Sequence, residues 1–207
     1  MAEQYHSALL IAGVDEAGRG PLAGPVLAAA VILDPQKPIV GLADSKTLTA
    51  VQRSTLAVQI QSGVLAWAVG RAEVAEIDRY NILQASLMAM QRAVTALPIL
   101  PALVLIDGQH SPVLRCKSQT LIKGDQFCPA ISAASILAKV TRDAEMLQLD
   151  ALYPHYGFAS HKGYGTPQHL RALKQYGPTP IHRRSFAPVK NSVKALDCLV
   201  TDALSGI

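Results

Sequence analysis

Cysteine is scarce in this chain of 207 residues, which contains only Cys116, Cys128 and Cys198. No two of them lie at the short spacing of a zinc-binding pair, and an odd number cannot complete a disulfide framework. This composition excludes a small domain held together by disulfides and indicates free thiols in a reducing compartment. We therefore expect a cytoplasmic protein.

Long hydrophobic runs are also missing. The longest, residues 21–33, contains two prolines and is shorter than the ~20 apolar residues that a membrane-spanning helix needs. The first twenty residues lack the basic start of a secretory signal. Half of the residues are hydrophobic and 16% are charged, which excludes an intrinsically disordered chain. We expect one globular domain, monomeric and without membrane contact.

Acidic residues are absent from residues 151–196, although the whole chain has 15 of them against 19 Lys and Arg, a net charge of +4. The same stretch contains histidines, tyrosines and these basic residues: Lys162, Arg171, Lys174, Arg183, Arg184, Lys190 and Lys194. This distribution predicts a polyanionic partner, above all nucleic acid. We therefore divide the chain into a main domain, residues 1–150, and a basic substrate-binding segment, residues 151–207, packed on it.

Short apolar stretches alternate with longer helical patterns. Strands are predicted over residues 9–14, 26–33, 65–69 and 103–106. Helices are predicted over residues 49–61, 77–97, 127–149 and 167–176, and the Thr49-x-x-Gln52 pattern of a capping box opens the first. This order predicts an α/β protein with a mixed sheet flanked by helices and a small helical C-terminal segment. The early strands are expected to pair as antiparallel neighbours.

Two predicted strands end in acidic residues, Asp15 and Glu16 after the first and Asp107 after the strand at 103–106. The functional crevice of an open α/β sheet lies beyond the carboxyl ends of its strands, so these carboxylates can meet there. Like charges at short range are unfavourable without a cation between them, and hard divalent cations prefer oxygen ligands. The pattern indicates a metal site, whereas the alternative is that each Asp only forms a turn. Asp15 and Glu16 can reach one ion only if the chain curls there, because adjacent side chains of an extended strand face opposite sides.

Other positions have a functional and a structural interpretation. Asp125 either binds the same cation or caps the helix that follows it. The glycines of Gly18-Arg19-Gly20 allow the backbone to approach a ligand closely, although the loop matches no nucleotide-binding fingerprint. Lys46, just before the first helix, is open to both interpretations.

Tyr164 lies between two glycines in the segment HKGYGTPQH. An exposed aromatic ring among basic residues can stack on a base or sugar while the cations meet phosphates. The alternative is a packed tyrosine in an ordinary turn, but the basic surroundings favour nucleic-acid contact. His182, Arg183 and Arg184 either extend that contact or form a solvated basic face.

Taken together, these motifs resemble those of the ribonuclease HII family. The similarity covers nearly the whole chain and runs through GVDEAGRGPLAGPV at 13–26, DSK at 44–46, LIDG at 105–108, KGD at 123–125, SAASILAKVTRD at 132–143, HKGYGTPQH at 161–169 and HRRSF at 182–186. The resemblance implies a ribonuclease H-like catalytic domain in residues 1–150. It implies an endonuclease that cuts the RNA strand of RNA–DNA hybrids and cuts 5′ of single ribonucleotides in duplex DNA, leaving 3′-hydroxyl and 5′-phosphate ends.

The resemblance also implies roles for individual residues. Four carboxylates would be catalytic and would bind Mg²⁺ or Mn²⁺ in a two-metal mechanism: Asp15, Glu16, Asp107 and Asp125. Three loop residues would read the ribose 2′-hydroxyl, largely through backbone atoms: Gly18, Arg19 and Gly20. Tyr164 would pack on the sugar of the next deoxynucleotide. Second-line candidates for phosphate contact or support of the site are Lys46, Ser135, Lys139 and Arg142.

Two other functions fit parts of the sequence. A carboxylate–metal nuclease of related fold, such as a Holliday-junction resolvase, shares the acid cluster but has no use for a 2′-hydroxyl reader. A non-catalytic nucleic-acid-binding module would use the basic segment alone, but clustered carboxylates without a cation would repel phosphate. Substrate discrimination and metal-dependent cutting separate the three.

Overall fold

The computed structural model describes residues 10–42 and 45–193. Three residues named above lie outside the described residues: Asp44, Lys194 and Cys198. The chain forms two compact units. Of the described residues, the first unit contains those up to Ala17, those within Leu27–Arg71 and those within Ser86–Thr141, and the second contains Gly18–Val26, Ala72–Ala85 and those from Arg142 onward. The expected boundary at residue 150 stays a prediction.

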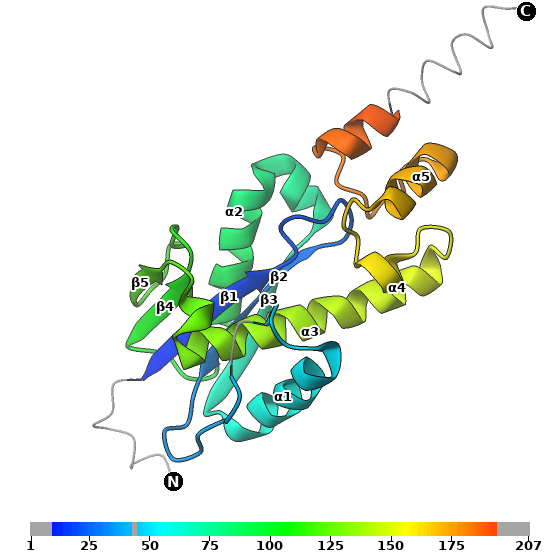
Figure 1. Cartoon of the computed structure of the whole chain (residues 1–207). Helices are drawn as coiled ribbons and strands as arrows, with labels where there is room; N and C mark the ends of the chain where they lie inside the picture. The colour runs from blue at the N-terminus through cyan, green and yellow to red at the C-terminus, as the bar shows by residue number, and fades with distance from the viewer. Residues whose placement is uncertain (1–9, 43–44, 194–207) are drawn as a thin grey trace, which may run out of the picture. The chain divides into compact units, whose positions relative to one another are not determined.

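A five-stranded sheet forms the centre of the first unit (Figure 1). Its strands are β1 (Ile11–Ala17), β2 (Val26–Ile32), β3 (Ala66–Ala72), β4 (Leu103–Asp107) and β5 (Lys117–Leu121). Their order across the sheet is β3-β2-β1-β4-β5. β1 runs antiparallel to β2 and parallel to β4, and β4 runs parallel to β5. The predicted mixed sheet and the antiparallel pairing of the early strands are confirmed.

Helices cover both faces of the sheet. α1 (Ala50–Gly63) and α3 (Pro129–Leu152) lie on the same face (Figure 1), where their side chains share a core with Ala29 and Val31 of β2. All seven residues of β2 are buried, so the other face must also be covered. α2 (Val74–Thr95) packs against β3 so closely that a Cβ at Gly70 would lie 2.0 Å from the carbonyl oxygen of Ala89.

The close approach of α3 to β1 depends on Gly13. A Cβ at this position would lie 2.1 Å from the backbone carbon of Ala130, which no side chain tolerates. Glycine is therefore required where the helix crosses the strand. This packing places the first turns of α3 on β1, two residues before the acidic pair.

The predicted helices are present, with shifted ends. The Thr49–Gln52 capping box opens α1, with both reciprocal hydrogen bonds formed. α2 begins at Val74, earlier than expected, and is kinked at Asn81, which has a φ of 70°. The Asn81 side chain accepts hydrogen bonds from the N–H groups of Leu83 and Gln84. Asn81 thus acts as the N-cap of the second part of α2, which begins after the kink.

The second unit has its own small core. The short helix α4 (Phe158–His161) and α5 (Pro167–Tyr176) follow the end of α3. The core brings together side chains from distant parts of the sequence, including Leu22, Met146, Tyr156, Phe158, Leu173 and Val189. The helical C-terminal segment and the bounds predicted for α5 are confirmed.

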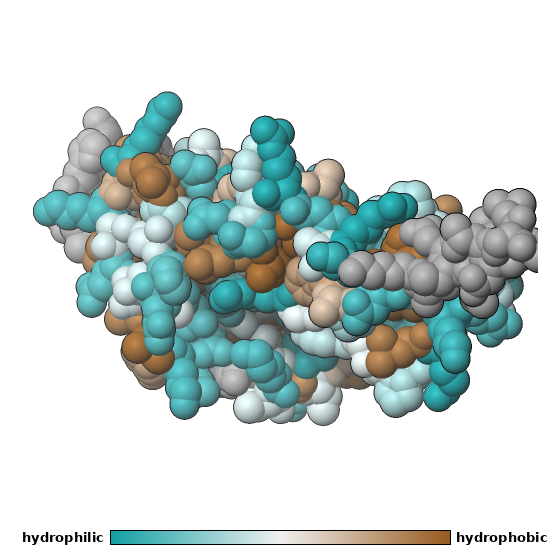
Figure 2. Space-filling model, turned by 90° about the horizontal axis from the view of Figure 1, so that it is seen from above, coloured by the Kyte–Doolittle hydropathy of each residue, from teal (hydrophilic) through white to brown (hydrophobic). Residues whose placement is uncertain are grey.

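Hydrophilic residues cover most of the face shown in Figure 2. On the face shown in Figure 2, hydrophobic residues form separate small patches between polar ones. No helix of the described residues is long and apolar enough to cross a membrane.

Candidate active site

Asp15 lies near the end of β1, on the sheet face covered by α3. It pairs with Ala29 of β2, and its side chain is only 5% exposed and hydrogen-bonds to Ser135 of α3. The next residue, Glu16, pairs with Ala28, and β1 stays extended through Ala17. The chain therefore does not curl between the two acids, and the alternation along the strand turns Glu16 to the opposite face.

Asp107 is the last residue of β4, the parallel neighbour of β1. Because Val14 pairs with Ile106, Asp15 and Asp107 come one residue later on adjacent strands. The expected meeting of acidic strand ends is thus confirmed for this pair. One oxygen of Asp107, Oδ1, is buried without a hydrogen-bond partner, which is unfavourable for a carboxylate unless a cation binds it.

Asp125 lies in a 3₁₀ turn, η2 (Gly124–Gln126), that contacts Asp107. It is 3% exposed, and a Cβ at Gly124 would lie 3.6 Å from Asp107 Oδ1. α3 begins at Pro129, so Asp125 lies too early in the chain to be its N-cap. The Ser132 hydroxyl donates to the Asp125 carbonyl at 2.5 Å and fixes the turn to α3.

The carboxylates repel one another. Burial, then the charges of Glu16 and Asp107, raise the pKa of Asp15 well above its ordinary value. Burial, then the charge of Asp125, raise the pKa of Asp107, and nearby backbone N–H groups and Lys46 offset part of this. Within residues 10–42 and 45–193, no three His, Cys, Asp or Glu side chains are grouped closely enough to form a ready-made metal site. The all-oxygen donor set and the unpartnered Asp107 Oδ1 fit a hard divalent cation.

Lys46 reaches this group from the segment before α1. Its ammonium is 3.5 Å from Asp125 Oδ2, and its side chain is 79% exposed. The neighbouring Ser45 hydroxyl hydrogen-bonds to that of Ser135 at 2.8 Å. Arg53 donates to the carbonyls of Ser45 and Leu48 at 2.8 and 2.5 Å, so the segment is held in place while the Lys46 side chain stays accessible.

The Gly18-Arg19-Gly20 loop belongs to the second unit, where Arg183 holds it. The Arg183 guanidinium donates to the carbonyls of Gly18 at 2.6 Å and Arg19 at 2.9 Å. In a trans peptide the carbonyl and the following N–H point in opposite directions. The N–H groups of Arg19 and Gly20 are therefore directed away from Arg183, as a pair of backbone donors.

Arg183 is fully buried, so its interpretation as part of a solvated basic face is wrong, and the same holds for His182 at 1% exposed. The guanidinium also donates to the carbonyls of Gly24 and Pro25. Burial, and then the charge of Arg142, lower the pKa of Arg183 to about 9. A local sequence pattern could not separate Arg183 from its exposed neighbour Arg184, because only the fold gives one of them carbonyl partners.

Arg142 supports the same loop from α3. It is 1% exposed and donates to the carbonyls of Ala23, Pro25 and Lys162 at 3.0–3.2 Å. A Cβ at Gly18, whose φ is +100°, would lie 2.1 Å from Arg142 Nε. Of its two expected roles, phosphate contact or support, the structure therefore favours support. Lys139, also on α3, is partly buried.

Tyr164 is 47% exposed and lies beside the loop. A Cβ at Gly20 would be 3.2 Å from Cε1 of its ring. The packed-turn alternative is therefore wrong for its side chain, which leaves an accessible ring next to the two backbone donors.

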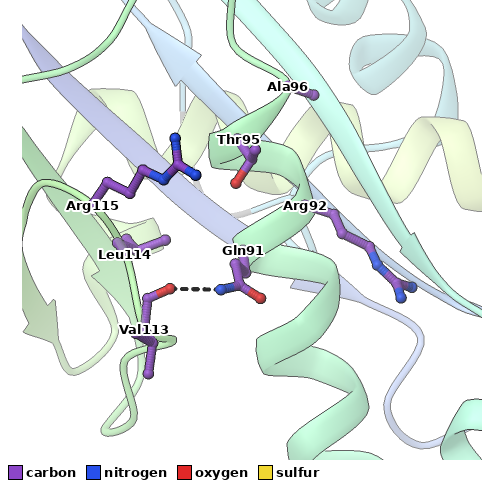
Figure 3. Close-up of a pocket in the computed structure, with 7 residues that line it drawn as sticks. All are labelled: Gln91, Arg92, Thr95, Ala96, Val113, Leu114 and Arg115. Atoms are coloured by element: carbon purple, nitrogen blue, oxygen red, sulfur yellow. Dashed lines mark hydrogen bonds between the residues drawn. The ribbon is translucent and has the colours of Figure 1, made fainter.

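A cleft elsewhere in the first unit contains none of these residues. It has a volume of about 650 Å³ and lies between the C-terminal half of α2 and residues 113–115 (Figure 3). Gln91 of α2 donates to the carbonyl of Val113 across it at 2.8 Å, and Arg115 extends toward Thr95 (Figure 3). The acidic side chains of Asp15 and Asp107 instead lie at the carboxyl ends of β1 and β4.

Comparison with known proteins agrees with this arrangement. The family model of ribonuclease HII matches residues 12–189. A ribonuclease HII of Bordetella pertussis is 65% identical over 181 residues, which cover 87% of this chain and 90% of that protein. The crystal structure of ribonuclease H2 from Pyrococcus horikoshii has a TM-score of 0.77 and 29% identity, covering 89% of this chain and 97% of that one. The fold is also that of Bst-RNase HIII, whose structure in complex with Mn²⁺ has a TM-score of 0.68 at 20% identity and covers 90% of this chain and 70% of that one. The chain therefore belongs to the ribonuclease HII family and has its ribonuclease H-like fold.

Proposed function

We propose that this ribonuclease cuts the RNA strand of RNA–DNA hybrids, and DNA duplexes 5′ of a single embedded ribonucleotide, leaving 3′-hydroxyl and 5′-phosphate ends. The observation that carries the proposal is the pairing of buried Asp15 with half-buried Asp107 on adjacent strand ends, with the buried Asp107 Oδ1 lacking a partner. Family membership supports hydrolysis of RNA. The location of Asp15 and Asp107 supports a carboxylate–metal mechanism.

Four carboxylates would hold the metal in this mechanism: Asp15, Glu16, Asp107 and Asp125. Two Mg²⁺ or Mn²⁺ ions, when bound, supply charge neutralisation and orient the attacking water and the leaving 3′-oxygen. Because β1 stays extended through Ala17, Glu16 would not share one ion with Asp15 and would hold the second ion instead. Lys46, accessible and 3.5 Å from Asp125, would hold a phosphate beside the reacting one while its charge balances the carboxylates.

The loop and Tyr164 would supply discrimination. An RNA reader must contact the 2′-hydroxyl, which alone distinguishes a single ribonucleotide from its DNA surroundings. The backbone donors at Arg19 and Gly20, directed away from Arg183, suit this contact, and the exposed Tyr164 ring suits packing on the next sugar. The loop begins two residues after Glu16. The residues proposed to recognise the 2′-hydroxyl therefore follow a proposed catalytic carboxylate directly in the sequence.

The test is a cleavage assay on a DNA duplex with one internal ribonucleotide, against an all-DNA control, with Mg²⁺, with Mn²⁺ and with EDTA. We expect one metal-dependent cut 5′ of the ribonucleotide and none in the control. Cutting of four-way DNA junctions instead would favour the resolvase alternative, and metal-independent binding without any cutting would favour the non-catalytic module.

Tyr164→Ala should weaken recognition of a single ribonucleotide more than it weakens the hydrolysis step itself. Stacking contacts of this kind contribute ~1–3 kcal/mol, so we expect a loss of about tenfold in kcat/KM at a single ribonucleotide and a smaller loss on a continuous hybrid. Tyr176→Ala is the matched control, because Tyr176 is equally exposed at 49% but stacks on His155. Equal losses on both substrates would remove the role proposed for Tyr164.

We also propose that the enzyme works as a monomer in the cytoplasm, with RNA–DNA hybrid and ribonucleotide-containing duplex as its partners. Cys116 and Cys128 are free thiols, as expected in a reducing compartment.

A further inference from the structure

Three of the four histidines of the basic segment are buried. His161, His169 and His182 are 9%, 0% and 1% exposed, in the core of the second unit. His161 stacks on His169 with ring centroids 4.7 Å apart, and Tyr156 and Phe158 surround the group. Buried imidazoles need a hydrogen-bond partner at each ring nitrogen, and here each has one.

The partners determine which nitrogen carries each proton. The backbone N–H of Thr179 donates to His182 Nδ1 at 3.0 Å, so a neutral His182 carries its hydrogen on Nε2. That nitrogen lies 2.9 Å from His169 Nε2, which must then accept. His169 therefore carries its hydrogen on Nδ1 and donates it to the carbonyl of Tyr164 at 2.9 Å.

This relay works only while both rings are neutral. A proton on His169 Nε2 would place two N–H donors face to face at 2.9 Å. Burial lowers the pKa of His169, and burial followed by the charge of His169 lowers the pKa of His182 to about 3. The other titratable rings packed against them are His161 and Tyr156. Within the described part of the chain, no acidic side chain is among the groups that shift the pKa of His169 or His182.

The relay ends on the backbone of Tyr164. The Tyr164 carbonyl also accepts from Thr166 N–H at 2.8 Å, and the Tyr164 N–H donates to the carbonyl of His161 at 2.9 Å. The backbone of Tyr164 is therefore held on both sides, although its side chain is 47% exposed. We propose that His169, with its tautomer set by His182, is a positioning residue that aims the Tyr164 ring at the ribonucleotide junction.

This inference rests on the function proposed for Tyr164, and a set of variants separates the two. His169→Leu removes the donor to the Tyr164 carbonyl, whereas His169→Asn keeps a donor close to the Nδ1 position. We expect His169→Leu to lower kcat/KM at a single ribonucleotide about tenfold, because small displacements of a positioned group have effects of this size. His169→Asn should recover most of the loss, and both should change cutting of a continuous hybrid less. His155→Asn, at an exposed histidine of the same segment, is the matched control.

The most decisive test combines His169→Leu with Tyr164→Ala in one protein. If His169 acts through Tyr164, His169→Leu costs nothing further in a Tyr164→Ala protein. A loss that persists there, or that is equal on both substrates, means a merely structural role and overturns the proposal. If Tyr164→Ala loses junction cutting while His169→Leu does not, only this inference fails. If Tyr164→Ala is like wild type, the function proposed for Tyr164 fails first.

A measurement on the unmodified protein keeps the proposal testable if His169→Leu does not fold. Two-bond ¹⁵N–¹H correlation of the imidazoles assigns each tautomer directly. At pH 6, below the ~6.5 of an unperturbed histidine, we expect neutral His169 with its hydrogen on Nδ1 and neutral His182 with its hydrogen on Nε2. A charged His169, or the reverse tautomers, would disprove the relay.

Discussion

We expect Asp107→Asn to abolish cleavage of an RNA–DNA hybrid and at the same time to make the metal-free protein more stable. If Asp107 holds the metal as proposed, its loss removes several kcal/mol of transition-state stabilisation, about 10³-fold or more in rate. The gain in stability comes from removing a carboxylate whose charge is unfavourable in the folded, metal-free protein. Burial and Asp125 raise the pKa of Asp107 above its ordinary value of 3.8, so the folded state binds this proton more tightly than the unfolded state. Stability is then lost as the pH rises through the interval between those two pKa values, and neutral Asn avoids that loss.

We expect a rise in melting temperature of at most a few degrees for a chain of this size, because Asp107 is only half-buried and solvent screens part of the repulsion. Thermal unfolding at pH 7 in EDTA measures it, and repeating the scan with Mg²⁺ should stabilise the wild type but not Asp107→Asn. Asp150→Asn is the matched control, because Asp150 also has a buried oxygen without a partner but lies in α3 outside the acidic group. It should cleave like wild type. Hybrid cleavage by Asp107→Asn would reject this site, and an inactive variant without a gain in stability would reject the repulsion argument.

The sequence predicted the elements whose patterns are local. The buried strand β2 is an unbroken apolar run, the Thr49 capping box marks the start of α1, and both lie where expected. β5 escaped prediction because its sequence KSQTL is polar and mostly exposed. It is a strand only because it pairs with β4 at the edge of the sheet. That pairing cannot be predicted from the five residues of β5 alone.

The acidic group shows the same limit at the level of a site. That two strands end in Asp could be read from the chain, and their parallel pairing brings Asp15 and Asp107 together. The face of the sheet to which Glu16 points could not be predicted from the sequence, because it depends on β1 staying extended through Ala17. The basic segment was interpreted by its charge, yet His169, His182 and Arg183 are buried. Composition predicts which side chains can bind phosphate, but burial decides which of them remain available for it.

Arg183→Lys is the substitution from which we expect the largest loss of stability. The guanidinium reaches four backbone carbonyls, those of Gly18, Arg19, Gly24 and Pro25, at 2.6–3.2 Å. Lysine keeps the charge but presents its three donors from a single point and cannot span that set. At least two of these four carbonyls then lose the Arg183 donor, at about 1–3 kcal/mol each, whereas the Pro25 carbonyl keeps Arg142 as a second donor. We expect the free energy of unfolding in urea to fall by roughly 3–5 kcal/mol.

The same substitution tests how the loop is oriented. Without Arg183 the carbonyls of Gly18 and Arg19 lose the group that directs them, and the peptide planes that present the Arg19 and Gly20 N–H groups are no longer held. Well below its melting temperature, Arg183→Lys should therefore lose discrimination between a ribonucleotide and a deoxynucleotide. Arg184→Lys is the control for stability, because the side chain of Arg184 is exposed and its N–H bond to Asp78 comes from the backbone. An Arg183→Lys protein within about 0.5 kcal/mol of wild type would place it among ordinary surface changes and contradict its role. Stability lost with discrimination intact would mean that Arg183 only stabilises the fold. The loop would then keep its orientation through Arg142, which donates hydrogen bonds to the carbonyls of Ala23 and Pro25.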